Sequence, residues 1–407
     1  MTATSTADHQ EMLDGLTYPT KRDEAWRYAP HDVLGQLSFG PPVESSRQLP
    51  PALDANIPAL KGPRIVLVNG VVDLERSELS ALPAGLRLLT FDDARREQPE
   101  LLAAHFDSDV DLSTGTFSAL NVAFGRNGAV VHVARGHAID MPVQIVDIVL
   151  PDEVGNASSS GAVIYLEEGA SATVAETRIG DGDFGGSNTR TTITVGDQAA
   201  LDHIVLQDVA STQAHLGRID ATQGAGSVLR CHLFNLGGRY GRVDYDVCLA
   251  GEGALVELTG LYFGTGNQVL DQQVTVVHAA PNCTSRQAFR GILDEKSTGV
   301  FNGGIDVRPG ADGTDAEQSN DNLLLSDRAE ANTQPRLEIL ADQVACKHGA
   351  TVGQLDGEAL YYLRTRGISE ADARRLLIEG FADQAIDSLD NEILRSWITE
   401  RVRRHDG

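Results

Sequence analysis

Four short stretches decide the fold of this 407-residue chain. Each holds small or acidic turn residues and leads directly into a β-rich run: Glu168-Gly169-Ala170, Asp197-Gln198-Ala199, Gly224-Ala225-Gly226-Ser227 and Glu252-Gly253-Ala254. Their equivalent positions are spaced 29, 28 and 27 residues apart: Ala170, Ala199, Ser227 and Ala254. Two short strands with two turns use about 28 residues, which is roughly one coil of a parallel β-helix. The spacing therefore predicts a stack of similar coils.

The β-rich pattern extends in both directions from these stretches, starting at about Ala129. Runs such as Val130–Val133, Val143–Leu150 and Val274–Val277 alternate with turns of Gly, Asp, Asn and Ser. An antiparallel sandwich also has recurring strands separated by turns. The repeat phase persists here, and the four repeated stretches contain no Asn-Gly or Asp-Gly pair of the kind that forms hairpin turns, which favours the β-helix. We expect a mainly β protein whose parallel β-helix core spans 111–348.

The first part of the chain, 1–110, is predicted to be a mixed N-terminal region. Thr20 and Asp23 resemble a capping box that opens a short helix at Glu24–Tyr28. Six of the fifteen prolines lie in 41–63, which is typical of an irregular linker. After it, two β-rich runs flank Asn69-Gly70, which is a hairpin signal. A helical segment follows at Phe91–His105.

The last part, 349–407, changes to helical periodicity and is predicted to be a C-terminal helical domain. Gly367 is placed to end a first helix, and Ser369 with Asp372 caps a second. The second and third helices each have an apolar face: Ala373, Leu376, Leu377 and Phe381, then Ile386, Leu389, Ile393 and Trp397. The first helix has an apolar face as well: Leu355, Ala359, Tyr362 and Leu363. Three such faces exceed what so small a unit buries, so apolar surface remains for the end of the β-stack or for a partner.

The composition excludes several classes of function. A net charge of −25 repels phosphate backbones and anionic lipid, which argues against nucleic-acid and membrane binding. None of the four lysines follows a glycine, so the chain has no Walker A loop and is not itself a P-loop ATPase.

The cysteines and the N-terminus indicate a cytoplasmic protein. Four cysteines without a C-x-x-C pair read as reduced thiols. Met1–Gly15 has acidic residues and lacks the apolar segment of a secretory signal.

The most distinctive chemical feature is Cys346-Lys347-His348. In a strand, residues two apart share a face, so the thiol and the imidazole would lie side by side. Thiolate and imidazole suit iron, zinc or a nascent cluster, but two ligands leave a metal half-coordinated. The alternative from spacing alone is a buried thiol beside an incidental histidine.

Other groups of polar residues predict structure rather than chemistry. Cys231 and His232 are adjacent and would point to opposite faces of a strand, and His203, His215 and His278 read as structural histidines. An acidic group in a Gly-rich stretch lacks EF-hand spacing and reads as a solvated turn: Asp306, Asp312, Asp315 and Glu317. We find no convincing catalytic centre and predict that the protein is not an enzyme.

Several strings near the C-terminus occur together and in order. They are Asn322–Ser326, Ala329–Thr333, Leu337–Ile339, Cys346–Gly353 and Tyr361–Ile368, with Phe301–Gly303, Asp315–Gln318 and Glu24–Tyr28 before them. This series closely resembles the SufB/SufD family of iron–sulfur cluster assembly proteins. The string His348–Asp356 is similar to the SufD branch, and the small number of cysteines suits the branch that is not thought to hold the cluster.

The resemblance implies a right-handed parallel β-helix between an N-terminal helical region and a C-terminal helical domain. It implies a complex in which this chain pairs with a SufB-like β-helix protein and docks a SufC-like ABC ATPase. His348 matches the family's histidine at the interface between the two β-helices, and Cys346 matches a nearby cysteine. We therefore expect a transient iron or cluster shared with the partner, and no firmly bound cofactor. For the ATPase we expect contacts in the C-terminal domain: Tyr362, Leu376, Leu377 and Phe381.

Two alternatives from other classes remain at this point. One is a β-helix enzyme such as a polysaccharide lyase, which needs a basic or calcium-lined groove. The other is a homodimeric structural adaptor without a metal role.

Overall fold

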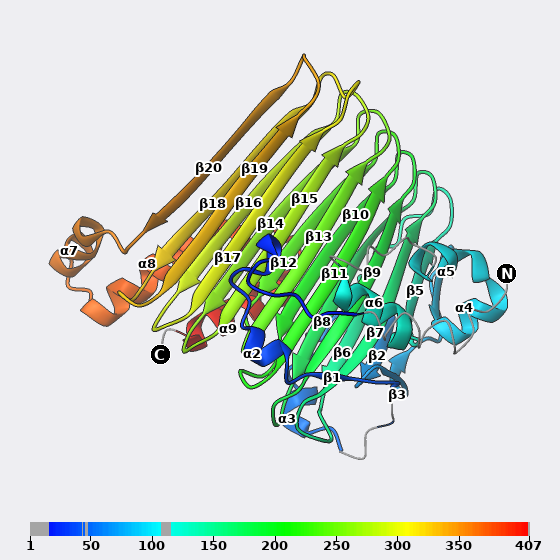
Figure 1. The fold of residues 1–407 in the computed structure, drawn as a ribbon, viewed down its shortest axis with the longest axis horizontal. Helices are drawn as coiled ribbons and strands as arrows, with labels where there is room; N and C mark the ends of the chain where they lie inside the picture. Colours follow the sequence, from blue (N-terminus) through cyan, green and yellow to red (C-terminus); the bar gives the residue numbers. More distant parts are fainter. Residues whose placement is uncertain (1–15, 43, 45–47, 107–114, 406–407) are drawn as a thin grey trace.

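The computed structural model describes residues 16–42, 44, 48–106 and 115–405. Its centre is a parallel β-solenoid of about eight turns (Figure 1). Two ten-stranded sheets form its opposite walls. From Gly128 onward the chain alternates between them one strand at a time, so strands that follow each other in this part of the sequence lie in different sheets. The signal-peptide prediction concerns residues 1–15, which lie outside the described part.

The first sheet contains the odd-numbered strands of the solenoid and two N-terminal strands: β1 (Ser38–Phe39), β4 (Leu86–Thr90), β5 (Gly128–Val133), β7 (Asn156–Leu166), β9 (Gly186–Val195), β11 (Ala214–Gln223), β13 (Tyr240–Leu249), β15 (Val269–His278), β17 (Thr298–Val307) and β19 (Glu330–Ile339).

The second sheet contains the hairpin strands β2 and β3 and the even-numbered strands from β6 onward: β2 (Arg64–Val68), β3 (Val71–Glu78), β6 (Val143–Val149), β8 (Ser171–Gly180), β10 (Ala200–Asp208), β12 (Val228–Asn235), β14 (Leu255–Gly264), β16 (Thr284–Leu293), β18 (Asp315–Leu324) and β20 (Ala345–Gly353).

The repeat predicted from sequence is confirmed by the strand register. Ala200 pairs with Ser171 on one side and Val228 on the other, so the small residues just before these strands stack at one corner of the coil. They are at most 1% exposed: Ala170, Ala199, Ser227 and Ala254. The residue directly before each of them has a positive φ, which turns the chain. This residue is glycine in three of the four coils and Gln198, with a φ of 57°, in the fourth. Since neighbouring solenoid strands are parallel, the sandwich alternative is wrong.

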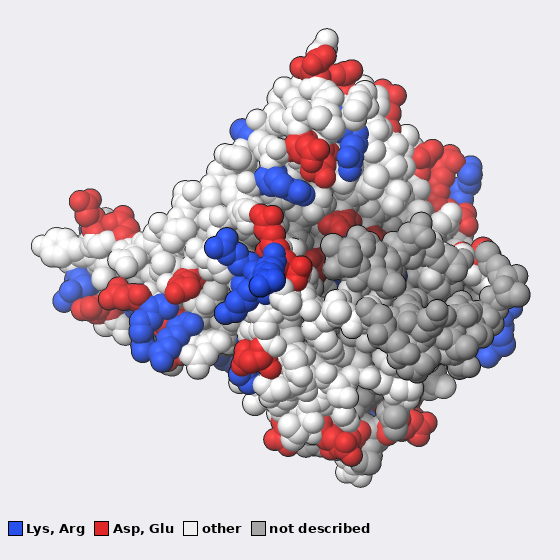
Figure 2. Space-filling view, viewed as in Figure 1, with Lys and Arg blue, Asp and Glu red and all other residues white. Residues whose placement is uncertain are grey.

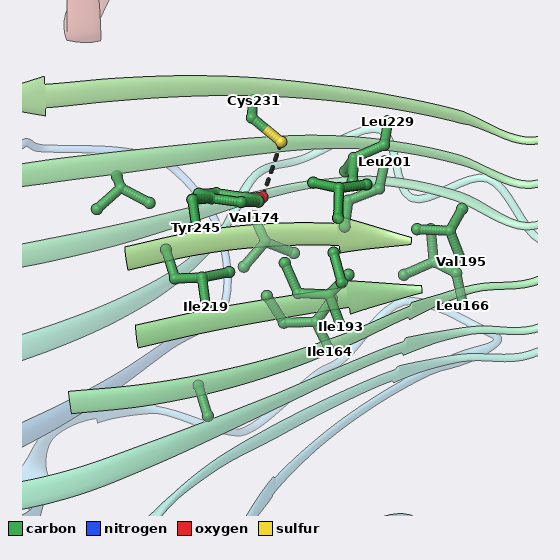
Figure 3. Packing of buried hydrophobic residues seen from close by; sticks show 14 of the residues in the cluster. Ile164, Leu166, Val174, Ile193, Val195, Leu201, Ile219, Leu229, Cys231 and Tyr245 are labelled. Atoms are coloured by element: carbon green, nitrogen blue, oxygen red, sulfur yellow. Dashed lines mark hydrogen bonds between the residues drawn. The ribbon is translucent and has the colours of Figure 1, made fainter. Parts of the chain in front are cut away.

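Apolar side chains from both sheets fill the space between the walls (Figure 3). Ile164 and Ile193 come from the first sheet and Val174 and Leu201 from the second, and all four are at most 1% exposed. Alternation along each strand sends every second side chain inward, so each coil buries its inner face against the coils above and below.

Parts of the N-terminal region belong to the solenoid itself. Strand β2 pairs with β6, and β4 pairs with β5, so both extend the sheets. The predicted hairpin at Asn69-Gly70 is confirmed: β2 and β3 are antiparallel, and both turn residues have positive φ. The Pro-rich stretch contains the short helix α3 (Pro51–Asp54).

Helices cover one end of the first sheet: α2 (His31–Leu34), α4 (Phe91–Glu97), α5 (Pro99–Phe106) and α6 (Thr116–Phe124). The predicted helix Phe91–His105 is interrupted at Gln98, because Pro99 cannot continue the hydrogen bonding of α4. The predicted helix at Glu24–Tyr28 is wrong in extent. It is a single 3₁₀ turn, η1 (Glu24–Trp26). One half of the predicted capping box is present, because the Asp23 carboxylate accepts from the Thr20 backbone N–H at 2.7 Å, but the Thr20 hydroxyl also donates to this carboxylate.

The C-terminal part forms three helices, α7 (Gly357–Thr365), α8 (Glu370–Ile386) and α9 (Glu392–His405). Helices α8 and α9 pack on the outer face of the second sheet, whereas α7 contacts α8 and has no buried residue. Ser369 caps α8 as predicted, accepting from the Asp372 N–H at 3.1 Å. The predicted third helix begins later than expected, because Ile386 still belongs to α8 and Asn391 supplies the cap of α9. Within the described ranges, no helix has the length and apolar character needed to cross a bilayer.

Candidate functional site

The solenoid ends at two strands that each lack a neighbour on one side. Strand β19 pairs with β17, and β20 pairs with β18, and the sheets described here stop at these strands. Figure 1 shows both strands along one side of the molecule, with α7 projecting beyond the end of β20. The outward edge of such a strand presents unpaired N–H and C=O groups that can pair with another chain. The candidate residues Cys346 and His348 lie on β20.

The side chains of Cys346 and His348 face the inside of the last coil. In the register of β18 and β20, Cys346 stands beside Ala316 and His348 beside Gln318. Ala316 and Gln318 are buried between the sheets, at 0% and 1% exposure. Cys346 is half-buried in the same apolar cluster, whereas His348 is exposed because no further coil covers it. The structure thus brings the predicted pair onto one face at the open end of the solenoid.

The environment of Cys346 favours the neutral thiol. Burial raises its pKa, the Asp315 carboxylate raises it further, and the Ala316 backbone N–H only partly opposes them. Because the thiolate is the form that binds metal, binding by Cys346 requires a cation close enough to displace its proton. The described residues contain no group of three or more His, Cys, Asp or Glu side chains that could hold a metal ion.

The acidic residues near this end form ion pairs on strands. Glu317 lies 3.0 Å from Lys347 and Asp315 contacts Arg286, while Asp306 is 3.9 Å from Arg336. These carboxylates extend from β17 and β18 and not from a single loop, so the geometry is that of surface ion pairs between coils.

The predicted docking residues fall into two groups. Tyr362 on α7 and Leu376 on α8 are 56% and 47% exposed, so they are available to a partner. Leu377 and Phe381 are half-buried, and the Arg290 guanidinium of β16 lies 4.9 Å from the Phe381 ring. Of the predicted apolar face of α8, Ala373 is fully buried and Leu376 is left exposed, as expected for a docking residue. The side of the helix that is covered by β14, β16 and α9 buries Ala373, Ile378, Ala382, Ala385 and Ile386.

A buried polar network inside the solenoid was missed from sequence. Glu176 accepts from Arg178 at 2.6 Å and contacts His203 at 2.7 Å. His203 contacts the Tyr245 hydroxyl at 3.0 Å, which lies 2.7 Å from the Cys231 sulfur (Figure 3). Arg178 and the hydrogen bonds from its neighbours outweigh burial and lower the Glu176 pKa to about 2. The only sequence signal for this network was the alternation of side chains along β8 and β10, which places these polar residues at inward-facing positions.

The other expectations for histidine and cysteine agree with this arrangement. Cys231 points inward, while His232 points outward to the Ser388 hydroxyl at 3.2 Å, so the two cannot share a ligand. His203, His215 and His278 are fully buried and hydrogen-bonded within the fold. All four cysteines are free thiols.

Charge is distributed unevenly over the surface. Acidic side chains gather at the turns that form the upper and lower edges of the solenoid in Figure 2. The strand surface toward β20 carries fewer charges in the same view. On this face, the strand surface beside β20 is therefore mainly uncharged.

Comparison with known proteins relates these features to a family. A model described as the SUF system FeS cluster assembly SufBD core domain matches residues 150–381. The chain belongs to the SufBD family. A second model, the SufBD protein N-terminal region, matches residues 7–145.

Individual relatives extend over almost the whole chain. The iron–sulfur cluster assembly protein SufD of Escherichia coli is 31% identical, covering 97% of this chain and 90% of its own. A SufBD family protein of Mycobacterium tuberculosis is 32% identical (96% and 90%), and one of Synechocystis is 29% identical (96% and 88%). The chain is thus a SufD-like member of a family for iron–sulfur cluster assembly.

Proposed function

We propose that this chain is a non-catalytic, SufD-type subunit of a cytoplasmic complex that assembles iron–sulfur clusters. The observation that carries the proposal is the position of His348 and Cys346 on the inner face of an edge strand, at the open end of the solenoid. Membership of the SufBD family supports the role in cluster assembly. The position of the two side chains indicates where a partner would complete a metal site.

The partner at this end is a SufB-like β-helix protein. Strands β19 and β20 offer free main-chain groups, and strand addition to a sheet edge satisfies them. The partner's strands would also cover His348, which the chain leaves exposed. A second copy of this chain offers the same edges, so a homodimer of the isolated protein is the competing pairing.

Iron or the nascent cluster would be cargo at this interface. His348 offers an imidazole nitrogen and Cys346 a sulfur, which are the ligand types that iron and iron–sulfur clusters use. Two ligands are insufficient, so the remaining ligands would come from the partner. Burial that keeps Cys346 protonated would make its participation dependent on the arrival of the cation.

The SufC-like ATPase would dock on α7 and the first part of α8. Helix α7 has no buried residue, and Tyr362 and Leu376 are exposed on this projecting part. Only Gln354, Leu355 and Asp356 separate the end of β20 from α7. A displacement of α7 by the ATPase would therefore be transmitted over a short connection to the strand that carries His348.

The test is His348→Ala in the complex with its SufB-like and SufC-like partners. We expect an intact complex that no longer assembles a cluster. The visible absorption of the cluster after anaerobic addition of iron and sulfide measures assembly. The matched control is His137→Ala, which removes another exposed histidine in the turn between β5 and β6, far from β20. Full cluster assembly by His348→Ala would remove His348 from the mechanism.

A further inference from the structure

Gln318 occupies the position directly beneath His348 in the solenoid. The two residues are register partners on β18 and β20, and Gln287 is the next residue down the same column, on β16. In adjacent parallel strands, side chains in register stand about 5 Å apart. Gln318 is 1% exposed and Gln287 is 2% exposed, so His348 stands on top of two buried amides.

The Gln318 amide is packed between Gln287 below it and the opposite sheet. Its Nε2 donates to the Gln287 Oε1 at 2.8 Å. On the opposite sheet, Gly303 makes room for it, because a Cβ at position 303 would lie 2.3 Å from the Gln318 Nε2. Phe301 closes the same space, 2.7 Å from that Cβ position. The amide nitrogen therefore has a hydrogen-bond partner, whereas the Oε1 has none in the described part of the chain.

The Gln318 Oε1 is a buried acceptor without a donor in the described part of the chain. A buried acceptor left unpaired destabilises the fold, so an arrangement that supplies a donor is favoured. His348 is its register neighbour on the open side, and an imidazole N–H is a suitable donor.

We propose that Gln318 is a positioning residue for His348: its Oε1 accepts the N–H of one imidazole nitrogen and leaves the other nitrogen free for iron. Histidines that bind metals usually donate their second ring N–H to a fixed acceptor, which selects the tautomer and the ring orientation. Gln287 and Gly303 hold that acceptor in place. This inference rests on the proposed role of His348, and it explains why Phe301–Gly303 and Asp315–Gln318 accompany the strand that carries His348.

The test measures the tautomer of His348 in the full-length chain without metal, by ¹⁵N NMR of the imidazole nitrogens. His348→Gln identifies its signals among the eleven histidines. Gln318→Met removes the acceptor at similar volume, and Gln318→Glu restores one. We expect the tautomer ratio of the original chain to change by about fivefold in Gln318→Met, as for the loss of a hydrogen bond of about 1 kcal/mol, and to return in Gln318→Glu.

The matched control is Gln272→Met on β15. Gln272 is also buried at 2% exposure and has an unpaired amide nitrogen, but it is not in the column of His348. A purely structural role of Gln318 predicts equal losses of stability in both Met variants and the same tautomer ratio in all chains, which would overturn the proposal. An equal change of the ratio in Gln272→Met would overturn it as well.

Cluster assembly separates this proposal from the function on which it rests. If His348→Ala assembles clusters normally, the proposed function fails whatever the tautomer. If His348→Ala is inactive and the Gln318 variants keep the original tautomer ratio, only the positioning role of Gln318 fails.

Discussion

The guanidinium of Arg242 lies 3.7 Å from the centroid of the Trp26 ring. Arg242 is buried on the outer face of β13, where it pairs with Asp244 and Asp271 and donates to the backbone oxygen of Ala25 at 2.6 Å. One cation thus joins the N-terminal segment to the solenoid. It gives the string Glu24–Tyr28 a structural role as the attachment of that segment.

Replacing Arg242 with Met should lower the free energy of unfolding by about 3–5 kcal/mol, because Asp271, which is 1% exposed, loses its charged partner. Urea unfolding measures this, and limited proteolysis should show earlier cleavage near Trp26. Arg27→Met is the control, since Arg27 is exposed and should change stability by less than about 0.5 kcal/mol. Equal stability of both variants would contradict this role of Arg242.

Removing one member of the buried pair of Glu176 and Arg178 should destabilise the protein strongly, whereas replacing both members with apolar residues should change its stability much less. Glu176→Ala leaves Arg178 charged inside the solenoid and should destabilise the protein by about 3–5 kcal/mol. The double variant Glu176→Leu with Arg178→Leu removes both charges and should recover most of this loss. Urea unfolding of the two variants decides it, and a double variant no more stable than Glu176→Ala would show that the network does more than neutralise a charge.

Acid should destabilise the protein partly through His278. Burial lowers its pKa to about 4, and the ring contacts Ser285 at 2.9 Å. Between pH 6.5 and 4 the unfolded chain binds a proton at His278 that the folded chain does not. The contribution of the neutral imidazole to the free energy of unfolding is therefore complete above pH 6.5 and is lost as the pH falls towards 4. The loss should approach about 3 kcal/mol at pH 4. In His278→Gln, stability measured over this range should fall less steeply; an unchanged slope would show that other groups cause the acid sensitivity.

The exposed side chains on α7 and α8 should contribute to ATPase binding. Tyr362→Ala with Leu376→Ala should weaken binding of a SufC-like protein by about 30–900-fold, if each residue contributes about 1–2 kcal/mol, without changing the thermal stability of the chain. Calorimetry measures the affinity. Val154→Ala, which changes a side chain 73% exposed elsewhere on the surface, is the control and should bind normally. Unchanged binding by the double variant would place the ATPase elsewhere.

Gly303 should not tolerate a side chain. In Gly303→Ala the new Cβ would displace the Gln318 amide and contact Phe301, which breaks the hydrogen bond to Gln287. We expect a loss of about 1–3 kcal/mol in unfolding free energy. Gly304→Ala is the neighbouring control, because its Cβ would lie 3.1 Å from the flexible end of Arg336 and at ordinary contact distance, 3.5 Å, from Thr275. A Gly303→Ala variant as stable as Gly304→Ala would show that the amide column adapts freely.

Features that depend on neighbouring residues were predictable from the sequence. The stacked position of Ala170 and Ala199 follows from repeat spacing, and the Ser369 cap follows from a local hydrogen-bonding pattern. The covered side of α8 was not predictable, because Leu376 and Ile378 are both apolar and only packing against β14 and β16 distinguishes them.

The candidate site shows the same division. The order of residues in β20 was sufficient to place Cys346 and His348 on one face, because side chains of a strand alternate. It could not indicate that this face is the inner one, or that Gln318 lies beneath His348, because that register joins strands thirty residues apart.

The sequence by itself therefore determined the coil, its repeat and the family, since each is written in short-range spacing and in motif strings. The tertiary structure alone decided which polar groups meet. Glu176 reaches His203, Arg242 reaches Trp26 and Gln318 reaches Gln287 only after coils have stacked in one register. Contacts of this kind depend on the sum of all turn lengths between the partners, and no local pattern contains that sum.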